Sequence, residues 1–105
     1  MPRLEKDVKK GVLTYLKTVP FAYAFSTPVS RYGSAGLADI TSVMAGYPVF
    51  IECKSPDAFK RKDHGLSPAQ IAFRDHIRKA GGYYFVVDGV NQLKYEMAME
   101  LGLTN

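Results

Sequence analysis

The spacing of apolar residues along the chain predicts three helices. From Leu4 to Lys17, apolar side chains recur every three or four positions, which is typical of an amphipathic helix, and Pro20 ends the pattern. A second helical pattern spans Ser67 to Ala80 and stops at a pair of glycines. A third runs from about Val90 to Leu101.

Short runs of β-branched and aromatic residues between these helices predict four strands. They are Phe21–Phe25, Leu37–Met44, Pro48–Lys54 and Tyr83–Asp88. Two polar stretches, "STPVSRYGSAG" and "SPDAFKRKDHG", are expected to be loops, and Ala45-Gly46 is expected to turn the chain. The element order α-β-β-β-α-β-α indicates an α/β fold. We expect one domain over residues 1–105, with a mixed sheet flanked by helices, one hairpin and one helical crossover.

Composition narrows the class of protein without naming a function. A hydrophobic fraction of 47% suits a globular domain, and no run approaches the roughly 18 apolar residues of a membrane span. The first ten residues are charged and have no apolar stretch behind them, so we expect no secretory signal. The single cysteine, Cys53, excludes an internal disulfide and fits a reducing compartment. We therefore expect a cytoplasmic protein.

The strand "VFIECKS" changes from apolar to charged midway, and a register count explains where its charges point. If Ala45-Gly46 forms a two-residue loop, Met44 pairs with Tyr47, and Asp39 then faces Glu52. A four-residue loop keeps the same register. Directly opposite residues share a face, and so does Lys54, two positions beyond Glu52. Ile51 and Cys53 would point the other way, into the core.

Two facing carboxylates beside a lysine suit a divalent metal. They repel each other unless a positive charge lies between them or one holds a proton. Mg²⁺ or Mn²⁺ prefers oxygen ligands, which Asp39, Glu52 and the backbone carbonyl of Cys53 would supply. Lys54 would then act on a water or on developing negative charge. The alternative is a plain Glu52–Lys54 salt bridge with Asp39 in solvent.

Basic residues cluster after this strand. The net charge is +4, and Lys60, Arg61 and Lys62 precede Arg74, Arg78 and Lys79 on a predicted helix. Such a cluster is typical of a phosphate-binding surface, although a merely soluble basic surface explains it equally well. Ser30, Arg31 and Tyr32 would contact phosphate or nothing. His64, in a charged loop, is more often simply solvated than a general base.

Three motifs in order carry a resemblance to a known family. "GLAD" at 36–39, "IECK" at 51–54 and "LSPAQ" at 66–70 resemble the VRR-NUC domain, a branch of the PD-(D/E)XK nuclease superfamily. The resemblance covers nearly the whole chain and implies a restriction-endonuclease-like core and Mg²⁺- or Mn²⁺-dependent hydrolysis of DNA. It also implies that Asp39 and Glu52 are metal ligands and that Lys54 is catalytic. Ala38 departs from the proline that the superfamily name places before the aspartate.

The resemblance adds Gln70 and Glu5 to the site, but each has a simpler explanation. Ser67 and Gln70 also form a capping box at the start of a helix, so catalysis and capping would compete for one amide. Glu5, which the resemblance places near the metal in a second site, is equally a first-turn acid that stabilises its helix.

We therefore expect an endodeoxyribonuclease. Stand-alone members of the family resemble Holliday-junction resolvases, so branched DNA and a homodimer are implied, with Lys60, Arg61, Lys62 and Arg74 contacting DNA. An interface through Tyr83, Tyr84, Met97 or Met99 is one option, although these residues would equally suit the core. The alternatives are a non-catalytic nucleic-acid-binding module and a structural subunit of a DNA repair complex.

Overall fold

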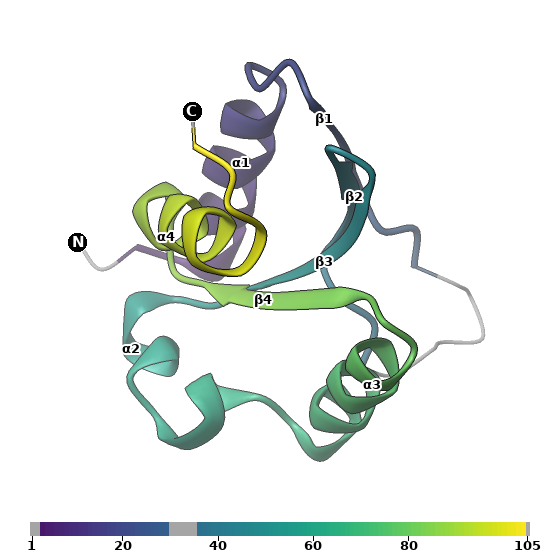
Figure 1. Cartoon of the computed structure of the whole chain (residues 1–105). Helices are drawn as coiled ribbons and strands as arrows, with labels where there is room; N and C mark the ends of the chain where they lie inside the picture. Colours follow the sequence, from purple (N-terminus) through teal and green to yellow (C-terminus); the bar gives the residue numbers. More distant parts are fainter. Residues whose placement is uncertain (1–2, 30–35, 105) are drawn as a thin grey trace.

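The computed structural model describes residues 3–29 and 36–104 (Figure 1). Its helices are α1 (Glu5–Leu16), α2 (Pro56–Phe59), the 3-10 helix η1 (Lys62–Gly65), α3 (Pro68–Lys79) and α4 (Val90–Leu101). Its strands are β1 (Ala22–Ser26), β2 (Ile40–Met44), β3 (Tyr47–Cys53) and β4 (Tyr83–Val87). The predicted α/β class and the order of the main elements are confirmed. Ser30, Arg31 and Tyr32 lie outside the described residues.

The four strands form one mixed sheet in the order β1-β2-β3-β4. The pairs β1–β2 and β2–β3 are antiparallel, and β3–β4 is parallel after the crossover through α3. The hairpin register agrees with the sequence count, because Met44 pairs with Tyr47 and Thr41 pairs with Phe50. The loop is the two-residue one, and both Ala45 (φ 49°) and Gly46 (φ 87°) take the left-handed conformation that a tight hairpin requires.

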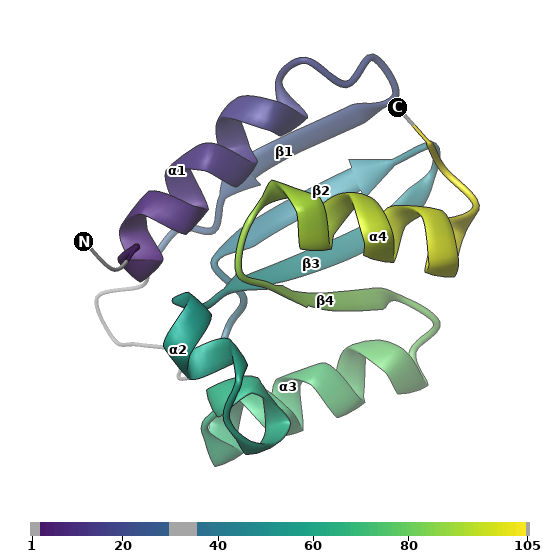
Figure 2. The same cartoon turned by 90° about the vertical axis from the view of Figure 1, so that its left-hand side faces the viewer.

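Helices cover the two faces of the sheet unequally. In Figures 1 and 2, α1 and α4 lie on one side of the sheet, whereas α3 lies on the other side, next to β4. We call the α1/α4 side the core face and the α3 side the site face. The core face packs Val8, Val12, Leu16, Val19, Ile40, Met44, Val49, Ile51, Cys53, Phe85, Val87, Leu93 and Met97 together. The site face has a smaller apolar cluster of Ala38, Leu66 and Tyr84, with Phe50, Ile71, Phe73, Ile77 and Val86 against it.

Two local predictions need correction. The charged stretch after β3 is not only loop: Ser55 caps α2 by accepting a hydrogen bond from the Ala58 amide (3.2 Å), and Pro56 starts that helix. The second strand begins at Ile40 rather than Leu37. Within residues 3–29 and 36–104, no helix combines the length and apolar content needed to cross a membrane.

Candidate active site

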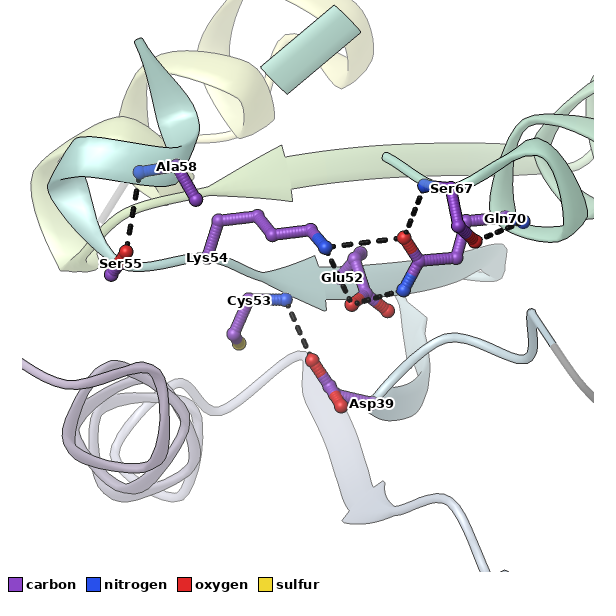
Figure 3. Close-up of polar contacts among 8 residues, drawn as sticks. All are labelled: Asp39, Glu52, Cys53, Lys54, Ser55, Ala58, Ser67 and Gln70. Atoms are coloured by element: carbon purple, nitrogen blue, oxygen red, sulfur yellow. Dashed lines mark hydrogen bonds and ion pairs between the residues drawn. The ribbon is translucent and has the colours of Figure 1, made fainter. Parts of the chain in front are cut away.

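Asp39 lies directly before β2, at the end of the hairpin opposite its turn. Its backbone carbonyl accepts a hydrogen bond from the Thr27 amide (2.9 Å), which continues the β1–β2 ladder by one position. Its carboxylate Oδ2 accepts from the backbone N–H of Cys53 (2.9 Å), as Figure 3 shows. Asp39 is therefore held against the end of β3 and not left in solvent, which excludes the simplest salt-bridge alternative.

Glu52 is a buried acid whose two oxygens have different surroundings. The side chain, which is 2% exposed, accepts a hydrogen bond at Oε2 from Gln70 Nε2 (2.9 Å) and lies 3.8 Å from Lys54 Nζ. Its Oε1 is buried, with no hydrogen-bond partner among the described residues. Burial raises the pKa of Glu52, and the charge of Asp39 raises it further, to about 8, while Lys54 opposes the shift. Burial and Asp39 therefore favour the neutral form of Glu52, and a bound cation would favour the ionised form.

Gln70 serves the helix cap and the site at the same time. Its Oε1 accepts from the Ser67 backbone N–H (2.8 Å) and from Lys54 Nζ (3.1 Å), and its Nε2 donates to Glu52. The capping box is complete, because Ser67 Oγ accepts from the Gln70 backbone N–H (3.2 Å). The expected competition between the two roles is wrong, since a side-chain amide has two lone pairs and two N–H groups.

Lys54 follows β3 and is 8% exposed. Its backbone N–H donates to the Val87 carbonyl (2.9 Å), which fixes its position beside β4. Its ammonium group then lies between the carboxylate of Glu52 and the amide oxygen of Gln70, as Figure 3 shows. The structure therefore brings Glu52, Lys54 and Gln70 into one hydrogen-bonded group, with Asp39 beside it.

Glu5, in the first turn of α1, is exposed but electrostatically linked to this group. Partial burial raises its pKa, and Asp39 raises it further, while Lys54 and Lys9 lower it. Its charge in turn raises the pKa of Glu52. The first turn of α1 thus places Glu5 near the end of the sheet where Asp39 and Glu52 meet. Its role as a ligand of a second metal stays a prediction.

The residues present fit a divalent cation in part. Across the described part of the chain, no three or more His, Cys, Asp or Glu side chains form a group that could hold a metal. The thiol of Cys53 lies in the core and its pKa is raised by burial, so this residue would contribute only its backbone carbonyl. Two other features do fit a cation. A cation would give Glu52 Oε1 a partner, and it would offset the repulsion between Asp39 and Glu52.

Three of the four predicted DNA-contacting residues line one cavity, and Lys62 is not part of its lining. Lys60, Arg61 and Lys62 are exposed, as expected for a binding surface. Lys60 and Arg61 line a cavity of about 420 Å³ together with Arg74, whose Nε is bonded to Asp75 (3.0 Å). His64 is more than a solvated loop residue, because its Nδ1 pairs with the Phe59 carbonyl (2.8 Å) and its ring stacks on Phe59.

Tyr84 and Met97 are buried, so the structure supports the core alternative for both residues and not the interface. Tyr84 pairs with Phe50 across the parallel β3–β4 ladder and so lies on the site face with Glu52. Together with Glu52 Oε1, its hydroxyl is one of two buried side-chain polar atoms without a hydrogen-bond partner in the described part of the chain. Only the β3–β4 register, which the sequence does not encode locally, would have revealed this.

Comparison with protein-family models, curated proteins and solved structures finds no match to this chain.

Proposed function

We propose that the protein is a divalent-metal-dependent endonuclease that cuts branched DNA, with the restriction-endonuclease-like core that its VRR-NUC-like motifs imply. One observation carries the proposal: two repelling carboxylates, Asp39 and Glu52, meet at a strand end where one buried oxygen has no partner. The Gln70 amide donates to the Glu52 carboxylate, and the Lys54 ammonium forms an ion pair with it at 3.8 Å. A bound cation would give this oxygen the partner that it lacks, which the ion pair with Lys54 alone does not do.

The chain's own residues divide the work of hydrolysis. Asp39, Glu52 and the Cys53 carbonyl would hold Mg²⁺ or Mn²⁺, which when bound supplies an acidified water and neutralises phosphate charge. Lys54 stabilises the negative charge that develops on the phosphate. Gln70 keeps the ammonium of Lys54 and the carboxylate of Glu52 at fixed positions, which limits the reorganisation that the reaction needs.

One observation favours the second candidate, a nucleic-acid-binding module without catalysis. Glu52 and Lys54 are almost fully buried beneath α3 and form a bonded group with Gln70, which is also what a structural polar cluster would show. The exposed basic residues Lys60, Arg61 and Lys62 would then bind DNA without cutting it.

A cleavage and binding experiment separates the two candidates. The protein is incubated with linear, flapped and four-way DNA in EDTA, Mg²⁺ or Mn²⁺, and Mn²⁺ binding is measured by calorimetry. We expect metal-dependent cuts at the branched substrates and loss of Mn²⁺ binding in Asp39→Asn and Glu52→Gln. Glu100→Gln, which removes an exposed acid on α4, serves as the control. DNA binding without cleavage, and Mn²⁺ binding unchanged in both site variants, would favour the binding module.

The resolvase interpretation also requires a dimer, since a four-way junction is cut twice by two equivalent sites. Exposed apolar side chains of β1 and β2 lie on the site face beyond α3: Tyr23, Phe25 and Val43. They offer a surface for a second copy. Light scattering with and without a junction measures the mass, and a monomer in both conditions would leave a nuclease that does not resolve junctions.

A further inference from the structure

A cavity of about 420 Å³ lies where η1, α3 and β4 meet, and its lining contains more cations than acids. Lys60 and Arg61 come from the segment between α2 and η1, and Arg74 and Arg78 come from α3. Asp63 and Glu96 are the acids of the lining. Arg74 is paired with Asp75 (3.0 Å), so three further cations face the two acids of the lining and the cavity keeps a net positive charge.

The inner wall of this cavity includes Tyr84, whose hydroxyl has no hydrogen-bond partner in the described part of the chain. The residue is 3% exposed, so water does not readily replace the missing partner. Burial raises the pKa of this hydroxyl, as do Glu52 and Asp39, whereas Arg74 and Arg78 lower it. The hydroxyl therefore lies within electrostatic reach of both the carboxylates of the candidate active site and the two arginines of the cavity.

These groups match the chemistry of a phosphate. A buried hydroxyl without a partner is unfavourable, and an acceptor oxygen within its reach would satisfy it. Arginine side chains bind phosphate oxygens through paired N–H groups. A phosphate group supplies several acceptor oxygens and a negative charge at once, and a neutral ligand would leave the cations uncompensated.

The rim of the cavity is built from strained backbone. Asp63 (φ 52°) and His64 (φ 55°) are consecutive residues in the left-handed region, and both line the cavity. Gly65 (φ 73°) follows, and a Cβ there would lie 2.9 Å from the Ala58 carbonyl oxygen. Such strain persists only where surrounding contacts impose it, and it is common at binding sites.

We propose that this cavity is a phosphate-binding site, in which Arg74 and Arg78 bind the phosphate oxygens and the Tyr84 hydroxyl donates to one of them. The proposal deepens the proposed function, since the phosphate would belong to a nucleotide or to nucleic acid held beside the candidate active site. The binding step itself requires neither metal nor hydrolysis. The volume exceeds that of one phosphate and admits the rest of a nucleotide.

The test measures phosphate binding in EDTA, so that no metal ion takes part. The full chain is titrated with inorganic phosphate, with a deoxynucleoside monophosphate and with an unphosphorylated deoxynucleoside, by calorimetry and phosphorus NMR. We expect both phosphates to bind and the deoxynucleoside not to. Arg78→Gln and Tyr84→Phe should each weaken binding about tenfold or more, because each removes a donor to a charged acceptor.

Two variants serve as matched controls. Lys10→Gln removes an exposed cation on α1, and Tyr95→Phe removes an exposed hydroxyl on α4. Both should bind phosphate as the wild type does. Tyr84→Phe should also melt no lower than the wild type, because its hydroxyl has no partner to lose, and this keeps a folding defect separate from a binding defect.

The outcomes are decisive in either direction. Tighter binding of the monophosphate than of inorganic phosphate supports the site and identifies a nucleotide as its source. No phosphate binding, or binding that Arg78→Gln and Tyr84→Phe leave unchanged, overturns it. Glu52→Gln separates the two proposals, because it should abolish cleavage yet retain phosphate binding in EDTA.

Discussion

The two faces of the sheet differ in how completely their polar atoms are satisfied. On the core face, Ser42 is the buried polar residue, and its hydroxyl donates to the Val49 carbonyl (2.7 Å). On the site face, Glu52 Oε1 and Tyr84 Oη are buried without partners. Native interiors rarely leave such atoms unpaired, and those that remain need an explanation. The core face therefore supplies stability, whereas the site face retains unused bonding capacity, which is what a ligand needs.

Lys54→Ala should have the largest effect and should act mainly on chemistry. We expect cleavage to fall by about 10²–10⁴-fold, the usual range for a lost acid–base or charge-stabilising group, with metal and DNA binding kept. Single-turnover rates on the preferred junction measure this, with Lys10→Ala as the control for a lost exposed cation. A normal rate in Lys54→Ala would remove the lysine from the mechanism.

Adjacent residues on β3 should respond in opposite ways. Ile51→Ala opens a cavity in the core face and should lower the free energy of unfolding by about 2–5 kcal/mol. Glu52→Gln removes an acid whose ionised form is disfavoured by burial and by Asp39, so the metal-free protein should be equally or more stable. Urea unfolding in EDTA measures both. A large loss of stability in Glu52→Gln would show that the acid is structural and would weaken the contrast between the faces.

The pH dependence of stability should also come from the site face. Because the pKa of Glu52 is raised to about 8 in the folded protein, the folded state binds more protons than the unfolded state between about pH 4.5 and 8. The stabilisation from this group is complete below that range and is lost as the pH rises through it. The melting temperature in EDTA should therefore fall as the pH is raised from 5 to 8.

One substitution and one ligand should each reduce the fall of the melting temperature with pH. Glu52→Gln removes the titrating group, and Mn²⁺ favours the ionised pair and should raise the melting temperature most at pH 8. A wild-type melting temperature that rises with pH in EDTA would contradict the shift assigned to Glu52.

The smallest expected effect separates the two roles of Gln70. Ser67→Ala removes only the N-cap hydroxyl and should cost about 1 kcal/mol of stability with little loss of cleavage. Gln70→Ala should cost a similar amount but also lower cleavage, because it frees Lys54 and Glu52. Denaturant unfolding and cleavage rates are compared for both variants. Equal rates in the two would assign Gln70 to the cap alone.

Local signals predicted the part of the site that one hairpin builds. A two-residue turn fixes the register, so Asp39 could be counted to the level of Glu52, and strand alternation placed Ile51 and Cys53 in the core. The parts that depend on distant segments were not predictable from local signals, and only the motif resemblance pointed to Gln70. The β3–β4 register places Tyr84 on the site face, and the packing of α3 lets Gln70 reach Glu52. Neither contact leaves a periodic pattern in the sequence.

The burial of Cys53 makes its thiol a probe of how often the sheet opens around β3. The thiol is fully shielded and its pKa is raised, so a thiol-specific reagent reacts only when the sheet opens around β3. Since the chain has no other cysteine, the labelling rate of the unmodified protein reports how often that strand separates from its neighbours. The backbone N–H of the same residue holds the Asp39 carboxylate, so labelling kinetics follow the opening of the segment on which the candidate active site is built.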